Sequence, residues 1–594
     1  MCGFVASFGF NFKENNFKKA LKHLSRRGPD SEGKWSEDKV FLGSRRLAII
    51  DLKKRANQPM HSLCSRYVLV FNGVIYNFLE LRDYLLAKGI KLRTYSDTEV
   101  ILELFALEQE KMLPKLKGMF AFVIWDRVKK KAFAARDPYG IKPLYIGTCK
   151  YGLIIASQVK TLLSTNLISK EYDIDSKSLF RILGFVIEPD TWFKNIKSLN
   201  AGNYIWIEKG AIISDIKWHD INKYWDNISL SNKKYSKEKV YKEVKKSVVE
   251  SVKRHLVSDV PVGLFLSSGI DSAVLAGLIV ENGHKSITGI TVSFNDFENT
   301  ENNEVEGAKV IAKHFGIKHY VYNVSKRDFI NDLPNILLAM DQPSIDGINT
   351  WYASKAASKL GLKVVFSGVG GDEIFFGYKL FKQIPILIKF ISIISKIPGV
   401  VKLINVFLIL ISYLKNNAKW RFILIWAKTV NGAWLLKRSI LTSRNSFFLK
   451  KNNTNLENLN NNFFYKKIFS VLSKKPNNNI RLKLAQMESV IYLRNQLLRD
   501  SDWASMYHGI ELRTPFVDVT LLNNLKNIFC YFPFFNSKAP LINCLTKKDL
   551  PKSITIKKKI GFETPIKQWI RELNKKRFKS LGWNDWMKTV SGIY

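Results

Sequence analysis

The second residue of the chain is a cysteine, one of only five among 594 residues. If Met1 is removed, Cys2 becomes the terminal residue, and its thiol then shares that residue with a free α-amine. The amine, whose pKa is roughly 7.7–8.0, can take the proton of the thiol near neutral pH. A nucleophile that carries its own base needs no distant histidine. The position of Cys2 therefore raises the hypothesis of nucleophilic chemistry at the start of the chain.

Two turns rich in Ser and Gly indicate a second kind of chemistry. VPVGLFLSSGIDSAVLA (260–276) reads as a strand, a tight turn and the start of a helix, and VVFSGVGGDEIFFGY (364–378) as a second strand that ends in such a turn. Small residues let backbone N–H groups approach a phosphate, and a helix N-terminus adds partial positive charge. Asp271 is placed to hold Mg²⁺ there, and Asp372 and Glu373 follow the second turn. We expect both turns to face one crevice at the carboxyl ends of parallel strands.

The elements that must position these residues fall into two patterns. Residues 1–212 alternate short apolar runs with Gly, Asn and Asp turns, which predicts antiparallel sheets, with helices over 79–89 and 98–110. Residues 213–240 are polar and poorly periodic, so we place a linker there. Residues 241–594 begin with alternating strands and helices, which predicts a doubly wound parallel sheet, and become helical after about residue 380. The fold class is therefore α/β with two domains.

The most apolar stretch of the chain runs from residue 384 to residue 415. Lys389, Lys396 and Lys402 interrupt it and Pro398 breaks it, so no charge-free run reaches the roughly 20 residues that a membrane span requires. We expect two or three amphipathic core helices here. Peripheral contact with a membrane is the alternative.

The composition is strongly basic, with a formal net charge of +42 at pH 7. An anionic partner would explain the charge, and so would a genome rich in AT base pairs, because both Lys and Asn are abundant. We favour the second explanation, since the lysines are spread along the chain and no nucleic-acid-binding motif accompanies them. The cysteines lack CxxC spacing, which argues against a disulfide framework or a zinc site and favours a reducing compartment.

Several motifs resemble those of a known enzyme family. SSGIDS (267–272) resembles the pyrophosphate loop of the ATP pyrophosphatases, whose usual form is SGGxDS, and FSGVGGDEIFFGY (366–378) resembles the second signature of asparagine synthetases. The motifs of an N-terminal-nucleophile glutamine amidotransferase occur in order: MCG (1–3), RRGPD (26–30), SRRLAIIDL (44–52), QPM (58–60), FNGVIYN (71–77), YSDTEV (95–100), GMFAF (118–122) and RDPYGIKPLY (136–145). LRDSDWASMYHGIELRTPFVD (498–518) and KKKIGFETPIKQW (557–569) resemble late synthetase motifs. The resemblance extends from residue 1 to about residue 570.

The resemblance implies an N-terminal αββα sandwich and roles for individual residues in it. Cys2 would attack the side-chain amide of glutamine, release ammonia and form a γ-glutamyl thioester. Asn72 and the N–H of Gly73 would form the oxyanion hole. Arg46 would bind the α-carboxylate of glutamine, and Asp97 its α-ammonium group.

In the second domain the resemblance implies binding of ATP and Mg²⁺. The residues implied to bind ATP are Leu266, Ser267, Ser268, Gly269, Asp271, Ser272, Val292, Ser367 and Gly368. Asp271 and Asp372 would hold Mg²⁺ on the pyrophosphate, and Lys559 would stabilise charge at the α-phosphate. A carboxylate would attack that phosphate, and ammonia would then displace AMP. The ammonia should travel through an internal tunnel, for which the stretches 118–126 and 136–145 are candidate walls.

Three positions depart from the family pattern. Ser268 replaces a glycine, which is a mild change if the residue avoids positive φ. Val74 stands where the family usually has glutamate. Val369 also replaces a glutamate, one implicated in forming the β-aspartyl-AMP intermediate, and valine can neither accept a proton nor bind ammonia through a hydrogen bond.

We therefore expect a cytoplasmic, glutamine-dependent asparagine synthase that consumes ATP and yields AMP and pyrophosphate. One alternative keeps the chemistry but changes the acceptor to another carboxylate, such as a uronic acid of a surface-polysaccharide precursor, which Val369 and the insertion at 380–475 favour. A second is a catalytically weak binding or regulatory paralogue. The expected partners are small molecules (glutamine, ATP, and aspartate or another carboxylate), with no nucleic acid and no transmembrane segment. The oligomeric state stays open, a homodimer included.

Overall fold

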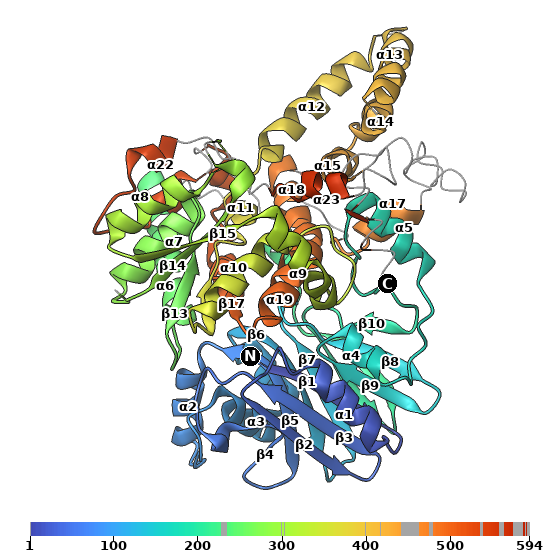
Figure 1. Cartoon of the computed structure of the whole chain (residues 1–594), viewed down its shortest axis with the longest axis vertical. Coiled ribbons are helices and arrows are strands. Elements are labelled where there is room, and N and C mark those ends of the chain that lie inside the picture. The colour runs from blue at the N-terminus through green and yellow to red at the C-terminus, as the bar shows by residue number, and fades with distance from the viewer. Residues whose placement is uncertain are drawn as a thin grey trace.

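The chain folds into an N-terminal half built on two antiparallel sheets and a C-terminal half built on a parallel sheet (Figure 1). The computed structural model describes residues 2–226, 235–284, 286–298, 300–301, 303–397, 399–415, 417–440, 463–473, 479–534, 538–556, 564–573, 586–587 and 590. Within these ranges, no helix is long and apolar enough to cross a membrane.

The N-terminal half contains two six-stranded antiparallel sheets, with the orders β10-β8-β9-β1-β3-β2 and β12-β11-β7-β6-β5-β4. The strands are β1 (Cys2–Phe8), β2 (Ser31–Glu37), β3 (Val40–Arg46), β4 (Met60–His61), β5 (Tyr67–Ile75), β6 (Gly118–Asp126), β7 (Lys131–Arg136), β8 (Tyr145–Cys149), β9 (Gly152–Ala156), β10 (Ile196–Ser198), β11 (Asn203–Glu208) and β12 (Ala211–Lys217). The helices are α1 (Glu14–His23), η1 (Lys54–Ala56), α2 (Phe78–Ala87), α3 (Asp97–Glu108), η2 (Gln109–Lys115), α4 (Val159–Ser164) and α5 (Ile174–Leu183).

The two sheets face each other, and helices cover their outer faces. Strand β1 is buried along its whole length because its side chains alternate between two cores. Phe4 contacts the second sheet in the central core, whereas Val5 lies in the same cluster as residues of α1 and α4. On the other side, α3 packs on β5. This arrangement is the αββα sandwich that the motifs imply.

The described residues at both ends of the predicted linker form regular structure, and residues 237–240 begin α6 (Lys237–His255). Residues 213–217 complete β12, which pairs with β11 through a register shift between Trp206 and Ile207. The short helix η3 (Ile221–Tyr224) and the buried Trp225 follow. The polar sequence pattern did not predict this strand, because β12 lies at a sheet edge and exposes nearly all its side chains.

The C-terminal half is organised around a five-stranded parallel sheet with the order β15-β14-β13-β16-β17. The strands are β13 (Val262–Phe265), β14 (Thr288–Phe294), β15 (Lys318–Val324), β16 (Val364–Phe366) and β17 (Glu511–Arg513). Strands β13 and β16 are parallel neighbours, with Leu264 opposite Phe366. Their carboxyl ends therefore carry the two Ser/Gly turns side by side, as the sequence predicts.

Helices cover both faces of this sheet and extend beyond it. Helix α7 (Ile270–Glu281) and α8 (Val305–Phe315) share the large core with β13, while α10 (Ile348–Lys359) packs in a separate cluster on the other face. The other helices are α6 (Lys237–His255), η4 (Asn295–Phe297), α9 (Lys326–Ala339), α11 (Gly371–Ile374), α12 (Leu380–Ile394), α13 (Val400–Leu414), α14 (Lys419–Trp426), α15 (Val430–Arg438), α17 (Phe463–Phe469), α18 (Ile480–Met487), η6 (Glu488–Leu498), α19 (Arg499–Met506), α20 (Val519–Leu525), η7 (Phe529–Phe534), α21 (Ala539–Ile542), α22 (Lys552–Ile556) and α23 (Ile566–Leu573).

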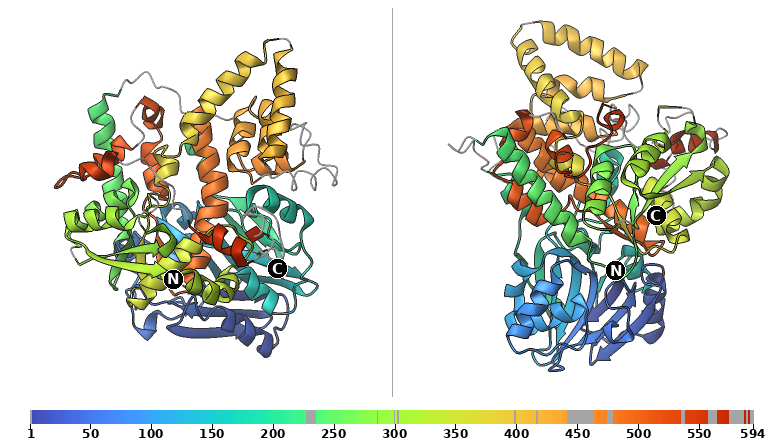
Figure 2. Two further views of the ribbon diagram at one scale, coloured as in Figure 1. Left: turned by 45° about the horizontal axis from the view of Figure 1, so that its top comes forward. Right: turned by 90° about the vertical axis from the view of Figure 1, so that its left-hand side faces the viewer.

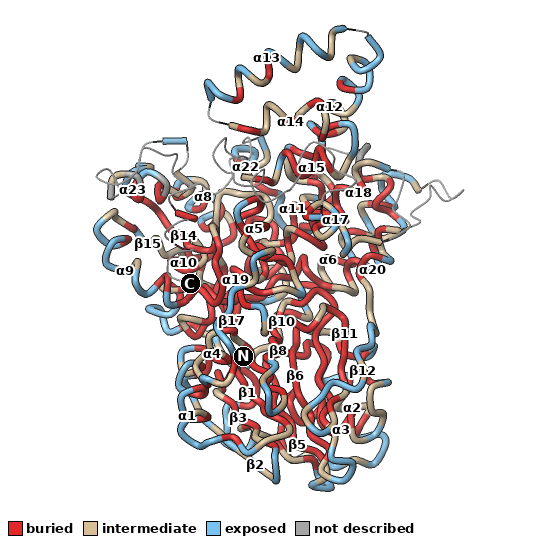
Figure 3. The backbone as a smooth tube through the Cα atoms, turned by 90° about the vertical axis from the view of Figure 1, so that its right-hand side faces the viewer, coloured by how far each residue is buried: buried red, intermediate tan, exposed pale blue. Residues whose placement is uncertain are grey.

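The stretch from residue 384 to residue 415 does not form core helices, which corrects the first expectation for it. It forms the outer part of α12 and all of α13, which project from the molecule at the end opposite the antiparallel sheets (Figures 1 and 2). Along α13 only Leu408 and Ser412 are buried, and the tube in this region is mostly exposed or half-buried (Figure 3). The helical period was correct, but the apolar stripes do not all face the protein.

Motif residues from both halves hold the two domains together. Arg27 of RRGPD and Lys142 of RDPYGIKPLY both pair with Asp502 of the late motif, at 2.7 and 3.2 Å. All three side chains are at most 7% exposed. Burial alone would raise the pKa of Asp502, but the charges of Arg27 and Lys142 hold it below its ordinary value. An ion triad therefore fixes the domain interface.

Candidate active site

Cys2 lies at the start of β1, directly opposite Arg46 on β3, and is buried. Burial raises the pKa of its thiol, although the positive charges of the chain's amino terminus and of Arg46 lower that pKa in part. The backbone nitrogen of Cys2 lies 3.4 Å from Oδ1 of Asn72. That nitrogen is the atom that becomes the α-amine if Met1 is removed, so Asn72 is placed to orient it.

Asn72 and Gly73, the residues expected to form the oxyanion hole, lie on β5. Asn72 is fully buried, and its Nδ2 has no hydrogen-bond acceptor in the described part of the chain. A buried donor without an acceptor is costly, so the Nδ2 group of Asn72 is available to donate to the oxygen of a ligand. Gly73 is required by packing, because a Cβ at this position would lie 2.1 Å from the carbonyl oxygen of Met119.

Arg46 and Asp97, which are expected to bind the two charged groups of glutamine, line the same pocket as Cys2. The guanidinium of Arg46 donates to the carbonyl oxygens of Ile50 and Asp51, at 3.0 and 2.6 Å, which fixes its orientation. Asp97 begins α3, and its Oδ2 accepts from the N–H of Ile75 at 3.1 Å. Burial raises the pKa of Asp97 to about 6.

The pocket around Cys2 includes two residues that the sequence did not point to. Gln58, in the cis-proline motif QPM, places its Nε2 3.9 Å from the sulfur of Cys2. The motif itself was a signal for this residue. Glu511, from β17 of the other domain, also lines the pocket. Because it is far from Cys2 in sequence, no local pattern predicted this contact.

The first Ser/Gly turn connects β13 to α7 and is held by its own hydroxyl groups. The hydroxyls of Ser267 and Ser272 lie 2.9 Å apart, and the N–H of Gly269 donates to Ser267 Oγ at 3.2 Å. Leu266 directly follows β13 and Val292 lies on the neighbouring β14, and both are buried. Ser268 does not adopt positive φ, so its replacement of glycine is indeed mild in this respect.

The second turn packs against the first so closely that side chains are excluded. A Cβ on Gly368 would lie 2.9 Å from Cβ of Asp271, and one on Gly371 would lie 2.7 Å from the Asp271 carboxyl carbon. The N–H of Ser367 donates to the carbonyl oxygen of Arg513 at 2.8 Å. Val369 follows, half-buried. The structure therefore brings the two Ser/Gly turns, which hold most of the residues expected to bind ATP, into contact.

Asp271 and Asp372 converge on one cation, the ammonium group of Lys538. Its Nζ lies 2.7 Å from Asp372 Oδ1 and also pairs with the carboxylate of Asp271. Lys538 is nearly buried, and nothing in the sequence distinguishes it among 93 Lys and Arg residues. Glu373 pairs with the hydroxyl of Tyr378 instead, and burial raises its pKa to about 7.

The carboxylate pair fits Mg²⁺. Both ligands are hard oxygen donors from loops that already converge on a positive charge, and Mg²⁺ is commonly bound by one or two carboxylates together with substrate phosphates. No cluster of three or more His, Cys, Asp or Glu that could hold a metal occurs within the described ranges. Lys559 lies outside the described residues.

The comparison with protein families decides the family of the chain. A glutamine amidotransferase domain matches residues 1–225, and an asparagine synthase domain matches residues 243–583. The chain belongs to the asparagine synthase family. Family membership supports a glutamine-hydrolysing, ATP-dependent ligase.

Relatives named as asparagine synthetases match between 65 and 97% of the chain. "Asparagine synthetase [glutamine-hydrolyzing] 1" of Bacillus subtilis (strain 168) is 30% identical over 97% of this chain and 89% of its own length. "Asparagine synthetase B [glutamine-hydrolyzing]" of Escherichia coli (strain K12) is 28% identical over 65% of this chain and 66% of its own length. Among solved structures, a glutamine phosphoribosylpyrophosphate amidotransferase from B. subtilis aligns at 16% identity over 54% of this chain and 65% of its own, with a TM-score of 0.30.

Proposed function

We propose that this protein is a glutamine-dependent asparagine synthase that amidates an adenylated aspartate and yields asparagine, glutamate, AMP and pyrophosphate. The observation that carries the proposal is the convergence of Asp271 and Asp372 on one cation, in a chain that also holds Cys2 beside the orphan donor of Asn72. The family relatives named as asparagine synthetases support it.

The amidotransferase step begins when the α-amine of Cys2 takes the proton of the thiol. The thiolate attacks the side-chain amide carbon of glutamine, and Asn72 Nδ2 and the N–H of Gly73 stabilise the oxygen that becomes negative. Collapse of this intermediate expels ammonia, with the proton returned by the α-amine. Water then cleaves the thioester to release glutamate. Arg46 and Asp97 hold the two charged ends of the substrate throughout.

The synthetase step takes place over the two Ser/Gly turns. A carboxylate of the acceptor attacks the α-phosphate of ATP, the bond to the β-phosphate breaks, and pyrophosphate leaves. Lys538 lies where the departing phosphates would gather negative charge, and its ammonium can stabilise them. Mg²⁺, when held by Asp271 and Asp372, would add the same electrostatic stabilisation. Ammonia then attacks the activated carbonyl and AMP leaves.

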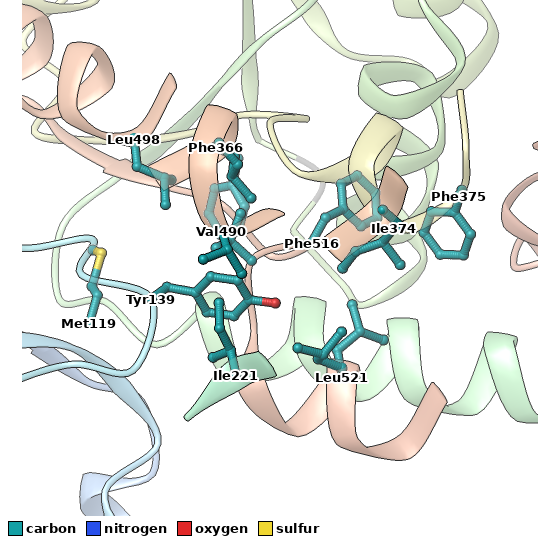
Figure 4. Close-up of a cluster of buried hydrophobic side chains, with 14 of the residues drawn as sticks. Met119, Tyr139, Ile221, Phe366, Ile374, Phe375, Val490, Leu498, Phe516 and Leu521 are labelled. Carbon is teal, nitrogen blue, oxygen red and sulfur yellow. The ribbon is translucent and has the colours of Figure 1, made fainter. Parts of the chain in front are cut away.

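An apolar region between the domains supports the proposed route for ammonia. Met119 and Tyr139, from the two stretches expected to form its walls, lie in a buried cluster with Phe366, Val490 and Phe516 of the second half (Figure 4). An apolar path favours neutral ammonia over the ammonium ion, because a charge is costly to bury. We propose that ammonia crosses this cluster.

The experiment that tests the function is an assay of pyrophosphate release with ATP, Mg²⁺ and glutamine across a panel of acids that includes aspartate, with asparagine measured directly. Cys2→Ala should lose glutamine hydrolysis yet keep ATP cleavage when ammonia is supplied, because the two centres are chemically separate. The expected result is release that depends on aspartate. Pyrophosphate release with other acids but none with aspartate would contradict the assigned acceptor.

Val369 favours a second candidate, the same reaction on another carboxylate such as a uronic acid. Its side chain provides no proton acceptor at the position where the family usually has glutamate, and general-base assistance is worth roughly 10²–10⁴-fold. If aspartate is the acceptor, Val369→Glu should accelerate asparagine formation. If a sugar acid is the acceptor, the added carboxylate should slow the native reaction, because it repels an anionic substrate.

A further inference from the structure

Helices α12 and α13, which we call the arm (residues 380–414), expose apolar stripes that no described part of the chain covers. On α13 the stripe consists of Leu403, Val406, Phe407, Leu410, Tyr413 and Leu414, between 56 and 86% exposed. The spacing of three and four residues places all six on one face of the helix. An apolar face of this kind normally packs against a core, but here it faces outward.

Helix α12 and the residues after it carry a second stripe with the same period. Ile386, Phe390, Ile393 and Ile397 follow one another at intervals of three or four residues and are between 48 and 69% exposed. The arm projects away from the rest of the molecule (Figures 1 and 2), so both stripes lie on a protruding element. Contiguous exposed apolar surface of this kind marks a contact site for a membrane or another protein.

The charge around the stripes has one sign. No Asp or Glu occurs between Glu373 and Glu457, although the chain as a whole has 51, and the same stretch contains fourteen Lys or Arg. Lys382 and Lys389 of α12, and Lys396 just after its end, recur every seven residues, which aligns the two helical lysines beside the apolar stripe. All three are exposed. A genome rich in lysine codons explains many lysines, but it does not explain why this stretch contains no Asp or Glu.

An anionic lipid surface fits this combination better than a second copy of the chain does. Two copies that met through their arms would bring lysines of both together and leave them without acidic partners from the same surface. A bilayer provides apolar depth for the stripes and negative headgroups for the lysines. Each helix has 15 residues, about 22 Å of length, which suits a position in the interface rather than a span of the roughly 30 Å core.

We propose that the arm docks the enzyme on anionic membranes, with α12 and α13 lying in the interface and their apolar stripes inserted among the acyl chains. The arm begins eight residues after Asp372, so docking would hold the synthetase crevice at the membrane. Docking of the arm would not depend on which carboxylate the enzyme amidates.

The test is co-sedimentation of the full-length protein with vesicles of phosphatidylcholine alone or mixed with phosphatidylglycerol. A variant with Phe390→Ser, Phe407→Ser and Leu410→Ser removes apolar contacts. Its matched control carries Val128→Ser and Ile174→Ser, which are exposed to a similar degree but lie in the other domain. A third variant, with Lys382→Gln, Lys389→Gln and Lys396→Gln, keeps the stripe but removes charge.

We expect the wild type and the control to bind the anionic vesicles, with binding weakened by salt. The apolar variant should lose binding. The lysine variant should bind on the order of 10²-fold more weakly, at about fivefold per lysine. Glutamine hydrolysis in solution reports that each variant is folded. Equal sedimentation of all proteins would overturn the proposal. So would a wild type that does not bind vesicles but forms a dimer in ultracentrifugation, if the apolar variant is a monomer.

Discussion

At the scale of single residues, the glutamine pocket combines a buried thiol with charges whose protonation depends on that burial. Asp97 is the clearest case, because burial raises its pKa to about 6. In the proposed function its carboxylate must be ionised to bind the ammonium group of glutamine. Binding should therefore be intact above pH 6 and should weaken as the pH falls through this value.

We expect the KM for glutamine to rise as the pH falls from 7.5 to 5, with about tenfold weaker binding for each pH unit below the pKa of Asp97. Asp97→Asn should raise the KM on the order of 10²-fold at pH 7.5, because a buried charge pair is lost, and should remove this pH dependence. Initial rates of glutamate formation across the range provide the measurement. A steep rise that persists in Asp97→Asn would assign the titration to another group.

Lys538 allows a second prediction at this scale. Lys538→Met keeps the length of the side chain but leaves the carboxylates of Asp271 and Asp372 without their shared cation. We expect ATP-dependent pyrophosphate release to fall at least 10²-fold, the scale of losing a charge that stabilises a transition state. Glutamine hydrolysis should stay near the wild-type rate. Unchanged pyrophosphate release would place the phosphates elsewhere.

At the scale of elements, the first Ser/Gly turn packs against a helix that lies far from it in sequence. A Cβ on Gly307 of α8 would lie 2.4 Å from Cβ of Ser268. The usual glycine at position 268 has no Cβ, so this atypical serine fits only because residue 307 lacks one. The two positions form a complementary pair between a helix and a turn.

We expect Gly307→Ala to lower the thermal stability and to raise the KM for ATP, since overpacking costs roughly 1–3 kcal/mol. Ser268→Gly in the same chain should reverse most of both effects, with a coupling energy of roughly 0.5–3 kcal/mol. Thermal unfolding and ATP kinetics of the single and double variants measure it. Additive effects would show that the two side chains do not compete for this space.

The sequence predicted most of these elements but not every contact between them. The turns after β13 and β16 could be predicted, because a strand, small residues and a helix start leave a local pattern. Lys538 and Glu511 could not, since each reaches its site through a fold that joins distant segments. The arm shows a third limit. A period of three and four residues reveals an apolar face, but it carries no information about what that face contacts.

At the scale of the whole molecule, the ion triad of Arg27, Lys142 and Asp502 joins the domains. The pKa of Asp502 lies below its ordinary value. The ionised carboxylate of Asp502 therefore stabilises the fold fully above the pKa of an unfolded aspartate. This stabilisation is lost as the pH falls through the lower pKa that Asp502 has in the folded protein. The domain interface should weaken only in strong acid.

We expect Asp502→Asn to destabilise the protein by roughly 3–5 kcal/mol, because two buried cations lose their partner. The loss should be largest near neutral pH and should shrink in acid, where the wild type loses the same charge. Denaturant unfolding at several pH values measures the difference. A matched control is Asp38→Asn, whose carboxylate pairs with Lys130 at the surface. An equal loss in both variants would show that burial of the triad is unimportant.

Glu511 has a consequence for attempts to divide the molecule. It belongs to β17 of the parallel sheet, yet it forms part of the wall around Cys2. A fragment that ends after β12 would contain every amidotransferase motif but would lack this wall, and water would reach Asp97. The pocket is therefore formed by residues of both domains. Transplanting the first domain onto another ligase would require a matching strand from the new host.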